Sequence, residues 1–265
     1  MRILWITDTH FDHLDENIKE DYMKEILSHN PDCLFITGDI SNSRTISSNL
    51  KSISKYFNIP IYFTLGNHDY YFSSFKGVDK QVNNLCQKHQ NLHFMDSVVL
   101  KELTGDTCVI GHTGCNDGGF GNFLDSNVML SDYMFINNLA GLYKCDLLDK
   151  LEKRSRQAVD HIKHSLSVAF GSYSKVFLLT HVPPWKEIST YQGVVSDNSW
   201  LPHFSCKMMG IAIEEFMKDC NGKLTVLCGH THDTIEMDIS HNIHVCVSGA
   251  EYGFTRIAKI IEIED

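Results

Sequence analysis

The chain has 265 residues, of which 43% are hydrophobic and 21% charged, and its formal net charge is -10 with histidine counted neutral. This composition is typical of a globular protein and excludes a disordered or fibrous chain. The acidic balance argues against a broad electrostatic grip on nucleic acid, which requires a basic face. Because no repeat, low-complexity tract or linker interrupts the sequence, we expect one domain over residues 1–265.

The N-terminal quarter of the chain alternates short apolar runs with amphipathic segments. Apolar runs indicate buried strands, and apolar residues at helical spacing indicate helices packed outside them. We therefore expect strands over Ile3–Ile6, Cys33–Thr37 and Ile61–Leu65, and helices over Ile18–Ser28 and Ile46–Phe57. This β-α-β-α-β order predicts neighbouring strands covered by helices.

The rest of the chain is predicted to continue this mixture. The expected helices are Val78–Lys88, Leu147–Phe170 and Ile211–Cys220. Two expected strands, Val98–Leu103 and Thr107–Gly111, form a hairpin. The other expected strands are Lys175–Leu179, Leu224–Cys228, Thr234–Asp238, Ile243–Val247 and Arg256–Ile263. The last four strands are expected to be antiparallel. Residues 113–122, rich in glycine and asparagine, and the proline-containing residues 182–206 are expected to be loops.

The cysteines and the N-terminus indicate the compartment. Nine cysteines, an odd number without a CxxC pair, favour reduced thiols over a disulfide framework or a structural zinc site. The N-terminus lacks the apolar region and cleavage site of a signal peptide, and no apolar stretch approaches membrane-spanning length. We therefore expect a cytoplasmic protein that does not associate with membranes.

Five polar clusters each follow a predicted strand. They are Asp8-x-His10, Gly38-Asp39, Gly66-Asn67-His68-Asp69, His181-x-x-Pro184 and Gly229-His230-Thr231-His232. Any one of them alone is typical of a turn or a loop. In open α/β sheets, however, functional sites gather at the carboxyl ends of strands, and chance turns do not explain five such clusters there. The pattern indicates one site assembled from five segments.

The residue types suit a two-metal site that acts on phosphoesters. A phosphoester resists attack because its anionic oxygens repel a nucleophile. Two divalent metals roughly 3.5–4 Å apart neutralise that charge and lower the pKa of a shared water. Such a pair needs a bridging carboxylate, and Asp39 is the candidate. A mixed Asp, His and Asn set favours Mn²⁺, Fe²⁺/Fe³⁺ or Zn²⁺ over Mg²⁺ or Ca²⁺, and the lack of thiolates among the candidates argues against structural zinc.

At these residues the sequence resembles the calcineurin-like metallophosphoesterase family, whose pattern is DxH, GDxx, GNH[DE], a later His, and GHxH. All five blocks occur in order between residues 8 and 232. The resemblance implies an α/β (α+β) fold: a β-sandwich of two mixed sheets flanked by helices in four layers, with the site at one end. It also implies hydrolysis of phosphate mono- or diesters by a hydroxide that bridges two metals.

The resemblance further implies a role for each matching residue. One metal would be held by Asp8, His10, Asp39 and His232, and the second by Asp39, Asn67, His181 and His230. His68 would stabilise the transition state or protonate the leaving oxygen, because a near-neutral imidazole is suited to donate a proton; alternatively, it only orients Asn67. For Asp69 we expect a turn or cap that orients this segment.

One departure from the family pattern narrows the assignment. The Ser/Thr protein phosphatase branch carries GDxxDRG, but here Asn42 replaces the second Asp and Ser43 replaces the Arg. Asn42 could hydrogen-bond His68 but cannot supply a carboxylate charge. The chain therefore resembles the broad bacterial branch of the family and not the Ser/Thr protein phosphatases.

Four further residues are candidates for substrate contacts. His112 could reach the substrate or be a loop residue beside a turn. Trp185 and Lys186 could line the entrance to the substrate site. Alternatively, Trp185 packs under a loop and Lys186 faces solvent. Tyr252 could close the edge of the pocket. Specificity is expected to lie in residues 111–144 and 182–206.

The sequence leaves two other functions open. A nuclease of the same superfamily would need a basic groove, and the basic run Lys150–Arg156 is expected to be a solvated helix face instead. A non-catalytic binding module on this fold would have lost metal ligands or the catalytic histidine, whereas all are present here. A small phosphoester is therefore the expected substrate, and nucleic acid is not the expected partner.

Overall fold

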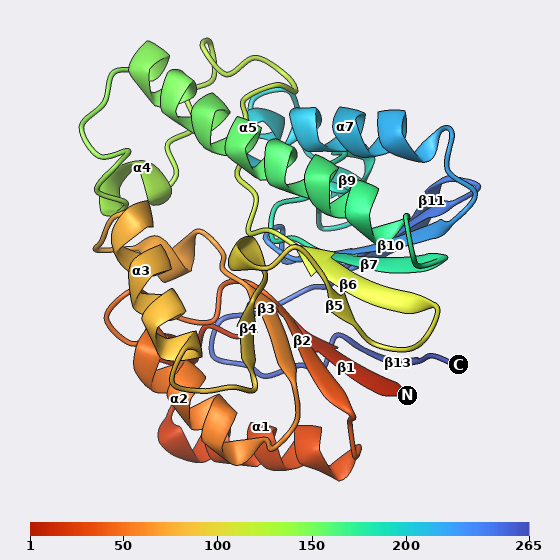
Figure 1. Cartoon of the computed structure of the whole chain (residues 1–265). Helices are drawn as coiled ribbons and strands as arrows, with labels where there is room; N and C mark the ends of the chain where they lie inside the picture. Colours follow the sequence, from red (N-terminus) through yellow and green to blue (C-terminus); the bar gives the residue numbers. More distant parts are fainter. Residues whose placement is uncertain (265) are drawn as a thin grey trace.

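The computed structural model describes residues 1–264 and contains two large sheets that face each other (Figure 1). The first has the order β13-β1-β2-β3-β4 and consists of β13 (Lys259–Glu262), β1 (Arg2–Ile6), β2 (Cys33–Thr37), β3 (Ile61–Thr64) and β4 (Leu92–Phe94). The second has the order β11-β12-β10-β7-β6-β5 and consists of β11 (Ile235–Ser240), β12 (Ile243–Val247), β10 (Lys223–Cys228), β7 (Lys175–Leu179), β6 (Thr107–Gly111) and β5 (Lys101–Glu102).

Both sheets are mixed. Strands β1 to β4 are parallel, and β13 is antiparallel to β1. Strands β12, β10, β7 and β6 are parallel, with β11 and β5 antiparallel at the edges. The expectation that the last four strands are all antiparallel is therefore wrong for β10 and β12. Strand β11 follows β10 along the chain but lies at the edge of the sheet, beyond β12. Strand β12 therefore lies next to β10 and runs parallel to it.

Helices cover the outer face of each sheet (Figure 1). The first sheet is covered by α1 (Glu16–Ser28), α2 (Ile46–Tyr56) and α3 (Phe75–Cys86), and the second by α5 (Lys144–Ala169) and α7 (Lys207–Met217). Each differs from its predicted bounds by a few residues at its ends, where helices fray. The resulting helix-sheet-sheet-helix arrangement confirms the predicted fold class.

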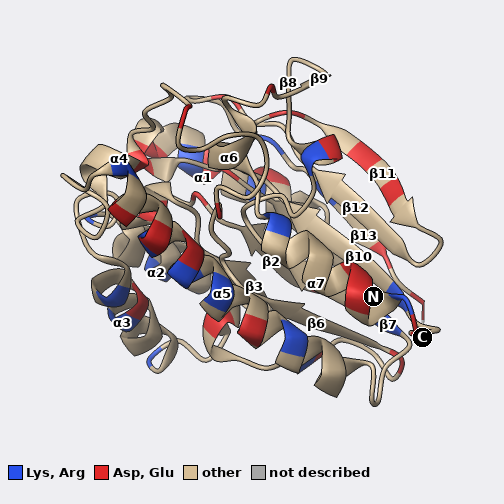
Figure 2. Cartoon of the chain, turned by 90° about the horizontal axis from the view of Figure 1, so that it is seen from above, with Lys and Arg blue, Asp and Glu red and all other residues tan. Residues whose placement is uncertain are grey.

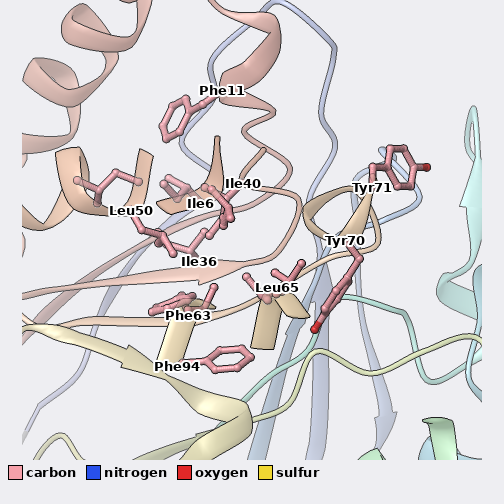
Figure 3. Close-up of a cluster of buried hydrophobic side chains, with 14 of the residues drawn as sticks. Ile6, Phe11, Ile36, Ile40, Leu50, Phe63, Leu65, Tyr70, Tyr71 and Phe94 are labelled. Atoms are coloured by element: carbon pink, nitrogen blue, oxygen red, sulfur yellow. The ribbon is translucent and has the colours of Figure 1, made fainter. Parts of the chain in front are cut away.

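The alternation of side chains along the strands divides the core into layers. In β1, Leu4 and Ile6 pack with the helices of the first sheet, whereas Ile3 and Trp5 pack between the sheets. Figure 3 shows part of the first layer, including Ile6 and Phe63. Burial on both faces explains why these strands are continuous apolar runs, which made them predictable from the sequence.

Short elements differ from the predictions. Strand β4 was not predicted, because its three residues do not form an apolar run. Strand β5 is shorter than the predicted Val98–Leu103, although its hairpin with β6 is present. Residues 182–206 were expected to be a loop but contain β8 (Thr190–Tyr191), β9 (Val194–Val195) and the short helix α6 (Leu201–Phe204). Residues 113–122 contain no helix or strand, as expected.

Acidic and basic residues are interspersed along α5 (Figure 2). The expectation of a solvated basic face there is wrong for Arg154. Its guanidinium lies 3.2 Å from the Asp79 carboxylate and donates a 2.8 Å hydrogen bond to the Tyr70 hydroxyl, and only 14% of its side chain is exposed. Arg154 therefore joins α5 to α3 and to the segment that follows β3.

Two findings concern the cysteines and the helices. All nine cysteines are free thiols. Within residues 1–264, no helix combines the length and the apolar character needed to span a bilayer.

Candidate metal centre

The five polar clusters meet at one edge of the sandwich, because each follows the carboxyl end of a parallel strand: β1, β2 and β3 in the first sheet, and β7 and β10 in the second. Backbone hydrogen bonds join neighbouring loops: the Asp8 amide donates to the Gly38 carbonyl at 3.0 Å, and the His10 amide donates to the Asp39 carbonyl at 2.9 Å. The His181 ring connects the two sheets, since its Nδ1 donates to the Thr37 carbonyl at 2.8 Å.

Strained backbone is concentrated at this edge. Eight non-glycine residues within the described chain have positive φ, and five are predicted metal ligands: Asp8, His10, Asp39, His230 and His232. Such conformations cost free energy and persist where the surrounding structure requires them, often at functional sites. Two glycines make room for the carboxylates. A Cβ at Gly66 would lie 2.1 Å from Asp39 Oδ1, and one at Gly229 would lie 2.0 Å from Asp8 Oδ2.

One group of side chains gathers around Asp8. Ligand atoms of Asp8, His10, Asp39 and His232 all lie within 4.8 Å of one another. The Nε2 atoms of His10 and His232 are 3.2 Å apart, and His232 Nε2 is 3.3 Å from Asp8 Oδ1. Both carboxylates are buried, with 2% exposure or less. Two buried carboxylates facing imidazole nitrogens can hold a cation.

A second group of side chains lies beside Asp39. His181 Nε2 is 3.0 Å from Asn67 Oδ1 and 3.5 Å from Asp39 Oδ2, and its ring centre is 5.0 Å from that of His230. Asp39 Oδ2 is also 3.9 Å from His10 Nε2 in the first group. This carboxylate oxygen is therefore close to ring nitrogens of both groups.

Further hydrogen bonds fix the candidate ligands. The His68 amide donates to Asp39 Oδ1 at 2.8 Å, which leaves Oδ2 free. The Asn67 amide nitrogen donates to Asp132 Oδ1 at 2.8 Å, so that Asn67 Oδ1 faces His181. Asp69 accepts hydrogen bonds from the amides of residues 40, 41 and 66, which agrees with the turn or cap role expected for it.

The donors of the second group fit a metal ion. With its Nδ1–H bound to a carbonyl, neutral His181 turns the lone pair of Nε2 toward the lone pairs of Asn67 Oδ1. A proton or a metal cation must lie between two such acceptors. Burial lowers the pKa of His181, but the charge and hydrogen bond of Asp39, the charge of Asp8 and the Thr37 carbonyl together raise this pKa to about 10, so the surroundings of the ring favour a positive charge. His230 Nε2 is also buried without a hydrogen-bond partner.

An open cleft of about 270 Å³ borders these groups. His68 and Tyr252 lie on its wall, with the Tyr252 hydroxyl 3.3 Å from His68 Nε2. The His68 ring stacks on Tyr71 with 4.3 Å between ring centres. The cleft therefore exposes one imidazole, outside the predicted ligand set, beside the buried carboxylates.

Other candidates lie away from the cleft. His112 Nδ1 accepts a hydrogen bond from the Gly114 amide, which matches the alternative of a loop residue beside a turn. Trp185 is buried and donates to Glu214 on α7, and Lys186 points to solvent near Glu187, so neither lines the cleft.

Asn42 could have hydrogen-bonded His68, but its side chain has other partners. Asn42 donates to Asp12 at 2.8 Å, and its side-chain oxygen accepts from the amide of residue 44, so the Asn42 side chain is held within its own turn and by Asp12.

Several residues of the site were missed by the sequence reasoning. Asp132 and Tyr71 support Asn67 and His68, while Tyr191 and Phe204 line the cleft. Asp132, Tyr191 and Phe204 fall within the two segments in which specificity was expected, but no motif distinguishes them there. The position of Tyr71 directly after the Asn67–Tyr70 turn was the one feature of the sequence that indicated its place in the site.

Known structures share this architecture. Phosphopantetheinyl hydrolase from Mycobacterium tuberculosis superposes with a TM-score of 0.66 at 13% identity, covering 93% of this chain and 89% of that chain. A dimetal phosphatase from Danio rerio superposes with a TM-score of 0.58 at 11% identity, covering 94% of this chain and 87% of that chain. GAP50, the anchor in the inner membrane complex of Plasmodium, superposes with a TM-score of 0.52 at 13% identity, covering 99% of this chain and 77% of that chain. At such low identities these likenesses show the fold alone.

The sequence comparisons identify the family. No curated protein matches the chain. The family model of the calcineurin-like phosphoesterases matches residues 1–234. Since this match spans most of the 265 residues, the chain belongs to the calcineurin-like phosphoesterase family.

Proposed function

We propose that the protein hydrolyses phosphate mono- or diesters at a site that holds two divalent metals. The observation that carries this proposal is the position of Asp39 Oδ2, within 3.9 Å of ring nitrogens from both groups of candidate ligands. In this proposal one metal is held by Asp8, His10, Asp39 and His232, and the other by Asp39, Asn67, His181 and His230. The mixed nitrogen and oxygen donors favour Mn²⁺, Fe²⁺/Fe³⁺ or Zn²⁺.

Two bound metals would neutralise phosphate charge and supply a water of lowered pKa. In the reaction, a bond forms between the water oxygen and phosphorus, and the bond between phosphorus and the alcohol oxygen breaks. The leaving oxygen then needs a proton. His68 is our candidate donor, because its ring lies on the cleft wall and is held by Tyr71 and the Tyr252 hydroxyl.

We also propose that the substrate is a small phosphoester and not a nucleic acid. Among the described residues that line the cleft, none is a lysine or arginine, and the whole chain is acidic. Nucleic acid binding needs basic side chains along the phosphate backbone. The nine free cysteines further support a cytoplasmic location, because reducing compartments keep thiols free.

The test is metal-dependent hydrolysis. Metal-free protein should be inactive on a panel of phosphate mono- and diesters, and Mn²⁺, Fe²⁺ or Zn²⁺ should restore activity. Turnover confined to DNA or RNA would assign the nuclease function instead. The absence of turnover with every metal and ester would favour a binding module on this fold.

The role of His68 can be tested separately. His68→Ala should keep its bound metals but lower kcat by roughly 10²–10⁴-fold, the usual contribution of a general acid. The control His164→Ala changes an exposed histidine on α5 and should retain wild-type activity. Wild-type kcat in His68→Ala would rule out the proton-donor role.

A further inference from the structure

A second cavity adjoins the cleft and is largely apolar. It has a volume of about 590 Å³ and is formed by the β8–β9 hairpin and α6. Its lining includes Tyr191, Val194, Val195, Trp200 and Phe204. Several of these side chains are unusually exposed for their type: Val194 is 69% exposed and Trp200 is 46% exposed. An apolar patch of this kind typically marks a binding surface, and the volume suits a small-molecule site.

The cavity is continuous with the cleft. Tyr191, Phe204 and Thr231 line both. A row of aromatic rings leads from one to the other: Trp200 lies 5.9 Å from Phe204, whose ring centre is 5.1 Å from that of the candidate ligand His230. The hairpin is held in this position, since the Gly193 amide donates at 2.8 Å to Asp233, the neighbour of His232. The two cavities therefore form one surface beside the candidate metals.

The charges of this surface indicate what it can accept. Neither cavity has a lysine or arginine among its described lining residues. The carboxylate in the apolar cavity, Asp197, accepts hydrogen bonds from the amides of Ser199 and Trp200. A substrate with several phosphates would lack cationic partners outside the metals. An apolar group attached to a single phosphate would instead bury exposed valine and aromatic surface.

We propose that the cavity binds an apolar substituent of the substrate, so that the enzyme prefers phosphoesters of large apolar alcohols. This inference rests on the proposed hydrolysis of phosphoesters at the adjoining cleft. Val194 and Trp200 would then determine specificity, and the phosphate would lie in the cleft between the candidate metals and His68.

Esters of different length test the preference. The probes are ethyl and hexyl phosphate as monoesters, and ethyl and hexyl 4-nitrophenyl phosphate as diesters. Each buried methylene group should raise kcat/KM by about fourfold, so the hexyl probe of the hydrolysed class should exceed its ethyl counterpart by at least about tenfold. A ratio of hexyl to ethyl below about twofold would overturn the proposal.

Two matched variants locate the preference. Val194→Asp places a charge in the cavity and should reduce the ratio of hexyl to ethyl by about tenfold. Val168→Asp introduces the same charge at a side chain on α5 that is 41% exposed, and should leave the ratio unchanged. An unchanged ratio in folded Val194→Asp would refute the assignment. If the wild-type protein is a dimer that Val194→Asp dissociates, the cavity belongs to a second copy and the proposal fails.

A binding measurement separates this inference from the catalytic proposal. Of the three tryptophans, Trp5 and Trp185 are buried, so Trp200 reports on the cavity. Hexylphosphonate, which cannot be hydrolysed as an ester, should produce a saturable change in tryptophan fluorescence, and ethylphosphonate should produce none. This result would support the cavity assignment even if no ester were hydrolysed. The same response to both phosphonates, or to neither, would overturn it.

Discussion

Asp132 offers a sharp test of how the second group of candidate ligands is held. Its Oδ1 accepts two hydrogen bonds, one from the Asn67 side-chain amide at 2.8 Å and one from the Tyr71 hydroxyl at 2.6 Å. Only 5% of Asp132 is exposed, so water cannot readily replace it. Asp132→Ala would remove this acceptor from the Tyr71 hydroxyl, would leave the Asn67 amide only its 3.5 Å contact with Tyr71, and would free Asn67 to rotate its oxygen away from His181.

The size of the effect follows from these contacts. An unsatisfied buried donor costs about 1–3 kcal/mol, and loss of a residue that orients a metal ligand typically weakens binding by about 10–100-fold. We therefore expect Asp132→Ala to raise the Kd of one of the two metals by about 30-fold. Asp132→Asn has the same shape and keeps a carbonyl oxygen as acceptor, so we expect a change of less than about fivefold.

Calorimetric titration of metal-free protein with Mn²⁺ measures both sites. In Asp132→Ala, one site should weaken while the site that contains Asp8 keeps its affinity. Equal affinities for wild type and Asp132→Ala at both sites would refute the reasoning. A thermal melt in the absence of metal provides the control for folding.

Two further predictions concern close packing and buried charge. Gly66→Ala would place a Cβ 2.1 Å from the candidate bridging carboxylate and should abolish binding of two metals. In the control Gly105→Ala, the new Cβ meets no atom within 4 Å, and this variant should bind metal normally. Calorimetric titration compares the metal affinities of the two variants. Arg154→Met leaves the Asp79 carboxylate without its cationic partner and should destabilise the fold by about 2–3 kcal/mol in urea unfolding. Arg156→Met, at an arginine that is 63% exposed, should change stability by less than about 0.5 kcal/mol; equal losses would contradict the buried role.

Much of the fold was predictable because its central strands are buried on both faces. Strands β2, β7 and β12 have the bounds predicted from their apolar runs, and the predicted ligands follow the ends of parallel strands. The order of the strands along the chain does not show that β12 pairs with β10 in parallel. That pairing depends on β11 lying at the edge of the sheet and not between β10 and β12. Arg154 was misjudged for a related reason: helical spacing does not show that α3 brings Asp79 against that face.

The site was only partly predictable. Motifs identified the side chains that gather around Asp39, since their residue types and their place after strands depend on the chemistry. Asp132, Tyr191 and Phe204 come from segments without regular patterns, and tertiary packing alone brings them to the cleft. The strained backbone of Asp8 and Asp39 was likewise hidden, because Asp in a turn is common.

The metal content of purified wild-type and Asp39→Asn protein tests the central claim most directly. Asn has nearly the same shape as Asp but lacks the charge that two metals would share. Elemental analysis by mass spectrometry, combined with an assay on the best ester of the panel, should find two divalent ions and activity in the wild type. Asp39→Asn should lose both. Full metal content and full activity in Asp39→Asn would contradict the proposed two-metal mechanism.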